Sequence, residues 1–318
     1  MRKFGVEIEL NSFDQRDFKK NPLEKDEYPK GIKEVCEIIN KSGLDCRIEN
    51  WHHTHNNRTW ICKPDSSCGI ELCSPVLDNL SQIIKVVSLL SDYKDIKIDN
   101  RCSFHVHIDV ADLLEIKDYS FGSNFEKTTY NFNVNSKLSN VLSWWIKSEH
   151  LFYDSVSDLR KSNKYCQCIG TLDIFEHDEK PELRNMIEKL GKNKYLSLNC
   201  YHLFKGNRPT IEFRLAGSDA CLDRNYIENW IELLLYFVNT SSRLEMPDNF
   251  CWIDLGEFLK IMNFKDEVKF WFLEKMSKNI CSNLINWDFN LRKFSILELE
   301  QIIVNLQLDK QFEVNYLK

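Results

Sequence analysis

The stretch Phe4-Gly5-Val6-Glu7-Ile8-Glu9-Leu10 alternates apolar and acidic residues with a period of two. In a β-strand this alternation places Val6, Ile8 and Leu10 on one face and both glutamates on the other. Side chains two residues apart on a strand are roughly 7 Å apart, so a cation close to both favours their ionisation. Taken alone, the pattern fits an edge strand with a solvated acidic face better than a metal site.

The same spacing of polar groups returns twice later in the chain. In the stretch 102–109, His105, His107 and Asp109 would share one face of a strand that is otherwise apolar. In the stretch 210–215, Glu212 and Arg214 would do the same. This repetition favours a polar site built from several strands over a solvated edge.

Two further features leave alternatives open. Glu71 lies in the apolar stretch 69–74, where either a metal ion or a paired Lys or Arg would explain it. The link 52–57 contains His52, His53 and His55, which fit a metal site or, more simply, a polar turn between strands.

Composition predicts a globular protein. With 43% hydrophobic and 12% aromatic residues, the 318-residue chain can bury a sizeable core. The net charge of −6 argues against sequence-independent binding of nucleic acid, because no Lys/Arg-rich face is evident. No apolar run approaches the ~20 residues that span a bilayer, so we expect a soluble protein without a membrane partner.

The chain contains 12 cysteines but no Cys-x-x-Cys pair. Most of them lie in apolar runs, and no secretory segment is evident. We therefore expect free thiols in a reducing cytoplasm and no structural zinc site.

Periodicity predicts the order of the elements. We expect a helix over 32–39 that Gly43 ends in a left-handed conformation, and a hairpin-like link between the first two strands that follow it. The stretch 111–135 has the character of an insertion. The expected strands are 4–10, 45–51, 59–63, 69–74, 102–110, 195–204 and 210–216, the last two joined by a hairpin turn at 205–209, and the further helices are 77–90, 136–161, 182–190, 226–238 and short ones after 246.

This order predicts an α+β fold with a curved, mainly antiparallel sheet of about six or seven strands and helices packed on one side. We expect a catalytic domain over residues 1–245 and a helical C-terminal extension over residues 246–318.

One face of that sheet would carry four carboxylates, two imidazoles and one guanidinium. Converging carboxylates raise one another's pKa, and each pKa unit corresponds to a free-energy cost of ~1.4 kcal/mol. Roughly two or three bound divalent cations would remove that cost. An excess of carboxylates over histidines favours Mg²⁺ or Mn²⁺ over zinc. Such a face suits phosphoryl transfer from a nucleotide, with Arg214 on a phosphate, although the chain has no glycine-rich phosphate loop. The face would consist of Glu7, Glu9, Glu71, Glu212, His105, His107 and Arg214.

Four motifs in order carry a resemblance to a known family. They are Phe-Gly-Val-Glu-Ile-Glu at 4–9, Lys-Pro-Asp-Ser-Ser at 63–67 running into Glu-Leu-Cys-Ser-Pro at 71–75, Cys-Ser-Phe-His-Val-His-Ile-Asp at 102–109 and Thr-Ile-Glu-Phe-Arg-Leu at 210–215. Over residues 1–238 the chain resembles the putative amidoligase family, which is related to glutamine synthetase and glutamate-cysteine ligase. Trp145, Glu149, Arg160, Tyr165-Cys166, Tyr195 and Asn199 are similar to this family with lower specificity.

The resemblance implies a glutamine-synthetase-like catalytic fold and an ATP-dependent ligase, in which a substrate carboxylate takes the γ-phosphoryl group and an amine captures the acyl phosphate. It implies metal ligands at Glu7, Glu9, Glu71, Glu212 and His105, catalytic roles for Arg214, His107 and Glu212, nucleotide contacts at Arg214, His105 and Arg160, and substrate contacts at Asp65 and Ser66. Ser67 and Cys68 depart from the family pattern, which bears on the substrate pocket.

Two rival functions stay open at this stage. A metal-dependent hydrolase would use the same ligand types and would turn over without nucleotide. A protein that keeps the fold but acts by binding or inhibition would not need the site intact. The carboxylate and the amine substrate could each be a small molecule, a peptide or a protein.

Overall fold

The computed structural model describes residues 2–12, 30–49, 58–65, 67–120, 129–134, 136–169, 189–205, 208–245, 252–281, 295–301 and 303–304. The chain forms two compact units. The first consists of residues 1–133 and 198–231, and the second of residues 134–197 and 232–318. The predicted boundary at residue 245 stays a prediction.

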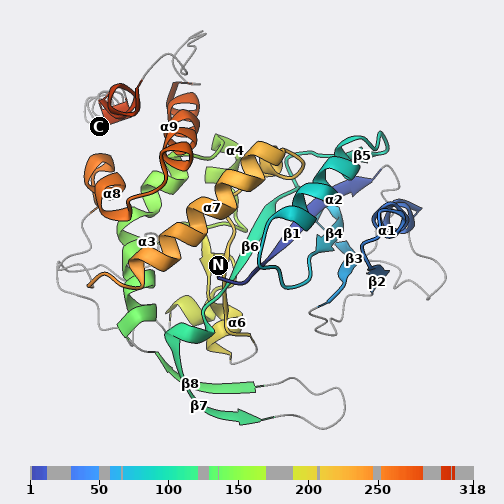
Figure 1. Ribbon diagram of the computed structural model, residues 1–318, viewed down its shortest axis with the longest axis horizontal. Coiled ribbons are helices and arrows are strands. Elements are labelled where there is room, and N and C mark those ends of the chain that lie inside the picture. The colour runs from blue at the N-terminus through green and yellow to red at the C-terminus, as the bar shows by residue number, and fades with distance from the viewer. Residues whose placement is uncertain are drawn as a thin grey trace. The chain divides into compact units, whose positions relative to one another are not determined.

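The first unit is built on an open eight-stranded sheet in the order β2-β3-β4-β1-β6-β10-β9, with β5 pairing β1 (Figure 1). All of these pairs are antiparallel except β2 with β3. The mixed α+β class and the open, mainly antiparallel sheet are therefore confirmed. Its strands are β1 (Phe4–Ser12), β2 (Cys46–Ile48), β3 (Trp60–Asp65), β4 (Gly69–Cys73), β5 (Ile96–Lys97), β6 (Phe104–Asp109), β9 (Leu198–Asn199) and β10 (Thr210–Phe213).

The alternation in β1 has the predicted effect. Val6, Ile8 and Leu10 are at most 2% exposed and form the apolar face of the sheet. Trp60 lies on the same face, and its indole donates to Gln82 of helix α2 (Ser81–Ser91) at 3.3 Å. Helix α1 (Lys30–Lys41) contacts β2, β3 and α2 (Figure 1). Both α1 and α2 therefore lie on the apolar side, and the acidic side chains of β1 point to the opposite face.

The end of α1 is also as predicted. Gly43 follows the helix with φ +84°, a left-handed conformation that glycine adopts without steric cost. Its backbone N–H donates to Asn40 O at 3.0 Å. The chain thus reverses directly into β2.

The prediction of a hairpin-like link between β2 and β3 is wrong, because these strands pair in parallel. Cys46 lies opposite Trp60 and Ile48 lies opposite Cys62. A parallel pair needs a long crossover and cannot be joined by a tight turn. The link of residues 49–59 supplies that length. The histidines at 52, 53 and 55 lie outside the described residues.

Pro64 belongs to β3, one residue beyond the predicted end of that strand. Trp60 N donates to Asp45 O, and Cys62 O accepts from Glu49 N, so these groups point towards β2. By the period of two, the nitrogen of Pro64 points to the same side, where β2 has already ended. No ladder hydrogen bond is therefore lost.

Two helices differ from their predicted bounds. The helix expected over 77–90 begins at Ser81, because Leu77 forms an extended bridge with Phe4. The helix expected over 136–161 is divided into α3 (Ser136–Asp154) and α4 (Asp158–Lys161). Ser157 takes an extended conformation at the break, with φ −61° and ψ 151°.

The strand expected over 195–204 is much shorter than predicted, and it does not lead directly into a hairpin turn. Only β9 pairs with β10, and the chain then forms the short helix α6 (Tyr201–Phe204). Asn199 Oδ1 accepts from Tyr201 N at 2.9 Å, which satisfies a backbone donor at the start of this helical turn. Most of the helix expected over 182–190 lies outside the described residues.

The stretch 111–135 contains structure that the sequence pattern did not predict. A 3-10 turn, η1 (Ala111–Leu113), leads into β7 (Leu114–Ser120), which pairs with β8 (Thr129–Val134) in a separate two-stranded sheet. A second 3-10 turn, η3 (Ser218–Ala220), follows β10.

The second unit is helical, with α8 (Leu255–Met262) and α9 (Asp266–Cys281) among its elements. Helix α7 (Arg224–Ser241) begins in the first unit and ends in the second. Aromatic packing fills the core of the second unit: Phe152 lies 4.4 Å from Trp145 and 5.6 Å from Phe272, measured between ring centroids. The helices predicted after residue 246 are confirmed in the described part.

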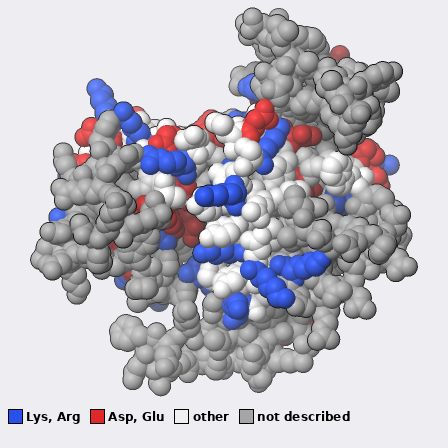
Figure 2. All heavy atoms as spheres, turned by 180° about the vertical axis from the view of Figure 1, so that it is seen from behind, with Lys and Arg blue, Asp and Glu red and all other residues white. Residues whose placement is uncertain are grey.

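Every cysteine whose side chain the structure describes is a free thiol, and most are buried. This agrees with their predicted use as small apolar residues. No described helix combines the length and the apolar character needed to cross a bilayer. On the face shown in Figure 2, Lys and Arg side chains lie among acidic and uncharged ones, and the expectation of no nucleic-acid partner stays a prediction.

The left-handed conformation of Gly43 yields a stability prediction. Gly43→Ala should lower the free energy of unfolding by about 1 kcal/mol, because an added Cβ meets no atom within 4 Å and the backbone conformation is the only penalty. Gly43→Asn should cost less, since asparagine tolerates this region. Urea unfolding followed by circular dichroism measures both, with the exposed Lys41→Ala as control. Equal stability of Gly43→Ala and the wild type would contradict the assignment.

Candidate metal and nucleotide site

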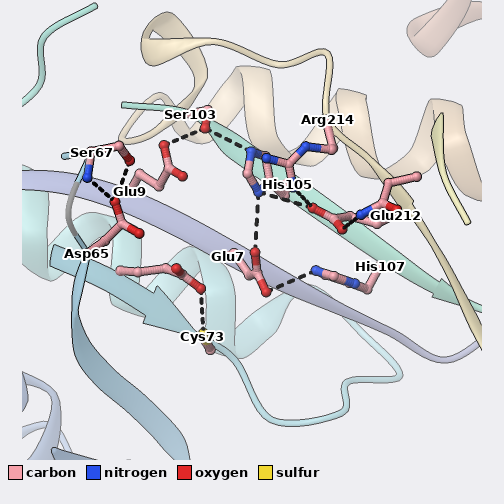
Figure 3. Close-up of polar contacts among 12 residues, drawn as sticks. Glu7, Glu9, Asp65, Ser67, Cys73, Ser103, His105, His107, Glu212 and Arg214 are labelled. Atoms are coloured by element: carbon pink, nitrogen blue, oxygen red, sulfur yellow. Dashed lines mark hydrogen bonds and ion pairs between the residues drawn. The ribbon is translucent and has the colours of Figure 1, made fainter. Parts of the chain in front are cut away.

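The polar face of the sheet gathers side chains from β1, β3, β4, β6 and β10 (Figure 3). Strand register places them: Glu7 lies opposite His105, Glu212 opposite His107, and Glu9 opposite Glu71. Because neighbouring strands hold these pairs in place, the predicted convergence of carboxylates, imidazoles and a guanidinium is present. The catalytic and ligand roles of the residues remain predictions.

Glu7 is the centre of this arrangement. Its Oε1 lies 3.2 Å from His107 Nε2 and its Oε2 lies 3.3 Å from His105 Nδ1. Burial raises the pKa of Glu7, but His107 and His105 outweigh burial and hold the pKa well below its ordinary value. Glu7 is therefore ionised at neutral pH.

Glu212 is held from two sides. Arg214 NH1 donates to Glu212 Oε1, and Asn199 Nδ2 donates to Glu212 Oε2 at 2.6 Å. Burial raises the pKa of Glu212, but Arg214 and His107 lower it below the ordinary value. Arg214 thus lies on the same face as Glu212, as predicted, with its side chain 16% exposed.

The two histidines have different environments. Burial and Arg214 lower the pKa of His105 to about 4, so this imidazole is neutral. Its Nδ1 lies 3.3 Å from both Glu7 and Glu212, and its Nε2 lies 2.8 Å from Ser103 Oγ. For His107, burial lowers the pKa, but Glu7 and Glu212 raise it above the ordinary value.

Glu9 is connected to this network through Ser103, whose hydroxyl donates to Glu9 Oε2 at 2.5 Å. The chain of contacts Glu9–Ser103–His105–Glu7 therefore links both glutamates of β1. Neither Ser103 nor Asn199 was assigned a role in the site from the sequence, because neutral polar residues near a strand carry no periodic signal.

Glu71 pairs with a lysine, one of the two explanations that its sequence context left open. Lys63 Nζ lies 2.6 Å from Glu71 Oε1, with side-chain exposures of only 8% and 12%. Cys73 Sγ lies 3.2 Å from the same carboxylate oxygen. Burial and Glu7 raise the pKa of Glu71 to about 7, against the opposing effect of Lys63. Lys63 and Cys73 belong to the family motifs but had no predicted role in the site, although both alternate in step with site residues of β3 and β4.

Asp65 closes a turn at the end of β3. Its Oδ1 accepts from the backbone N–H groups of Ser67 at 2.6 Å and Cys68 at 3.2 Å, and from the Ser67 hydroxyl. Burial raises the pKa of Asp65, but these hydrogen bonds lower it below the ordinary value. The predicted substrate contact at Ser66 lies outside the described residues.

Other predicted or family-like residues have contacts outside the network of Glu7, Glu212 and the two histidines. Asp109 accepts from Ala111 N at 2.9 Å and starts the 3-10 turn η1. Arg160 is buried in the second unit, as is Glu149, whose carboxylate accepts from Ile169 N at 3.0 Å and from Ser197 Oγ. The nucleotide contact of Arg160 stays a prediction.

Three side chains on the polar face could together hold a divalent cation. Glu7, His107 and Glu212 each offer one ligand atom, and these atoms lie within 4.8 Å of one another. The buried His107 Nε2 has no hydrogen-bond partner of acceptable geometry in the described part of the chain. Two carboxylates and one imidazole suit Mg²⁺ or Mn²⁺, which bind oxygen and nitrogen ligands at about 2.0–2.2 Å. His107 fits a ligand position better than His105, whose two ring nitrogens already contact protein groups.

These features define an α+β protein with a carboxylate-rich candidate metal site on one face of an open sheet. Comparison with protein families finds a match over residues 1–238 to the family described as "putative amidoligase enzyme", and the chain belongs to this family. A comparison with curated proteins finds no match. Membership of the family supports a ligase-type enzyme in general terms.

The raised pKa of Glu71 gives the metal-free protein a specific pH dependence. The folded pKa of about 7 exceeds the unfolded value of about 4.3, so the stabilisation from protonated Glu71 is complete below the lower value and is lost as pH rises through the higher one. Relative to Glu71→Gln, the wild type should therefore lose up to about 3 kcal/mol of stability between pH 5 and pH 8.

Unfolding midpoints measured in chelator across this range test the prediction. The exposed Glu37→Gln serves as a control that keeps the wild-type pH dependence. Parallel curves for the wild type and Glu71→Gln would show that Glu71 titrates normally.

Proposed function

We propose that the protein is an ATP-dependent carboxylate-amine ligase with a glutamine-synthetase-like catalytic fold. The single observation behind this proposal is the convergence of Glu7, His107, Glu212 and Arg214 on one sheet face, in a chain that belongs to an amidoligase family. Ionised carboxylates beside a guanidinium suit a site that handles phosphate with a divalent cation.

The reaction has two balanced steps. A carboxylate oxygen of the acid substrate attacks the γ-phosphorus of ATP, and ADP leaves. The amine nitrogen then attacks the acyl carbon, inorganic phosphate leaves, and the ammonium proton passes to a base. The product is an amide.

The chain's own residues have distinct proposed parts in this reaction. Glu7, His107 and Glu212 would hold Mg²⁺ or Mn²⁺, with Glu9, Glu71 and His105 as further ligands or supports, and the ion would neutralise phosphate charge. Arg214 would steady the phosphoryl group in flight. Asp65 and Ser66 would contact the substrate.

Metal-dependent nucleotide binding is the first test. ATP at about 100 times its Kd should stabilise the wild type by about 2.7 kcal/mol in the presence of Mg²⁺ or Mn²⁺, and should have little effect in chelator. Glu7→Gln should weaken metal binding by about 10-fold or more, whereas the exposed Glu37→Gln should not. Differential scanning fluorimetry measures the shift. An unchanged melting temperature with nucleotide and either metal would refute the proposal.

Arg214 is the second test. Arg214→Ala should reduce the rate of phosphate release from ATP by roughly 10³-fold, the magnitude expected for an arginine that stabilises a phosphoryl transition state. Arg224→Ala removes a surface arginine of helix α7 that is 61% exposed and pairs with Glu228, and should retain the rate. A phosphate-release assay with candidate acids and amines separates the two variants. Turnover of a substrate without nucleotide would instead identify a hydrolase.

A further inference from the structure

Lys63 is a deeply buried cation on the polar face. It lies on β3 directly opposite Glu71 of β4, and its side chain is only 8% exposed. Lysine is rarely buried to this extent unless its charge is paired. Its Nζ lies 2.6 Å from Glu71 Oε1, which supplies that pair.

The same place has the ligands of a second metal position. Glu7, Glu71 and Cys73 offer one ligand atom each, all within 4.8 Å of one another. Cys73 Sγ contacts Glu71 Oε1, the very oxygen that Lys63 contacts. Lys63 therefore already supplies a positive charge to the carboxylate that a second ion would need.

Electrostatics decides between the two cations. Two like unit charges 4 Å apart repel each other by about 4 kcal/mol at an effective dielectric constant of 20. The repulsion between a unit charge and a divalent ion at that distance is twice as large. Lys63 also lies close enough to Glu7 to lower its pKa. A divalent ion at the second position would thus be repelled by Lys63, which pairs with one of its three ligands, Glu71, and lowers the pKa of a second, Glu7.

We propose that Lys63 is a built-in cation that takes the place of a second divalent ion, so that the free protein binds one divalent ion, at Glu7, His107 and Glu212. This revises the two or three ions expected from the sequence. The inference rests on the proposed function for the first ion only. It makes Lys63 a positioning residue that sets the metal content of the site.

The test counts Mn²⁺ ions bound by the full chain without nucleotide, by electron paramagnetic resonance of the free ion at equilibrium. The wild type should bind about one ion per chain, and Lys63→Met about two, because the second triplet becomes available. The double variant Lys63→Met/Glu71→Gln should return to about one. Lys63→Arg keeps the charge and should bind as the wild type does, and Lys41→Met controls for the loss of an exposed lysine.

Each outcome bears on the inference. Two ions in the wild type, or no additional ion in a folded Lys63→Met variant, would overturn it. If Lys63→Met fails to fold by circular dichroism, the wild-type and Lys63→Arg counts decide it, since both should be about one. A wild type that binds no ion would refute the proposed first metal position, whereas the difference between the wild type and Lys63→Met would still report on Lys63 alone.

Discussion

The pairing register of β1 with its two neighbours is the constraint on which both the fold and the candidate site depend. Glu7 lies opposite Cys73 on one side and opposite His105 on the other. Because side chains alternate with a period of two, a slip of one residue would turn both glutamates of β1 into the apolar core and expose its aliphatic side chains. The burial of Ile8 and Leu10, at 0% exposure, excludes that alternative energetically. Core packing and site geometry are therefore specified by one and the same pattern.

The electrostatic free-energy cost of burying several carboxylates on one sheet face differs from one carboxylate to the next. Glu7 and Glu212 stay ionised because imidazole and guanidinium groups adjoin them, whereas Glu71 is less stabilised despite its lysine. Removing a partner from such a network leaves an uncompensated buried charge, which costs more than the intact pair contributes. The neutral residues Ser103 and Asn199 complete the network by donating to Glu9 and Glu212. Among these groups, His107 Nε2 and the carboxylates of Glu7 and Glu212 are best suited to bind an ion.

Local periodicity predicted those features that depend on one stretch of chain. The faces of β1 and β6 and the helix that Gly43 ends follow from alternation and conformational freedom, whereas the pattern around Glu71 left a metal ion and a basic partner equally open. Features that depend on distant partners were missed. The parallel pairing of β2 with β3 has no local signature, and the helical turn after Asn199 replaces a strand because one side-chain hydrogen bond overrides an apolar pattern. Lys63 had no predicted role in the site because only the register of β3 against β4 shows what it faces.

Pro64 affects how another molecule could pair with the border of β3. The nitrogen of this residue points to the side of β3 where β2 has ended, and a proline has no hydrogen to offer there. An extended segment from another molecule would find a gap in the row of donors at this border and could not continue the ladder. The same ring restricts the backbone next to Asp65, whose turn begins one residue later. A single imino acid thus disfavours the pairing of another molecule's strand at this border.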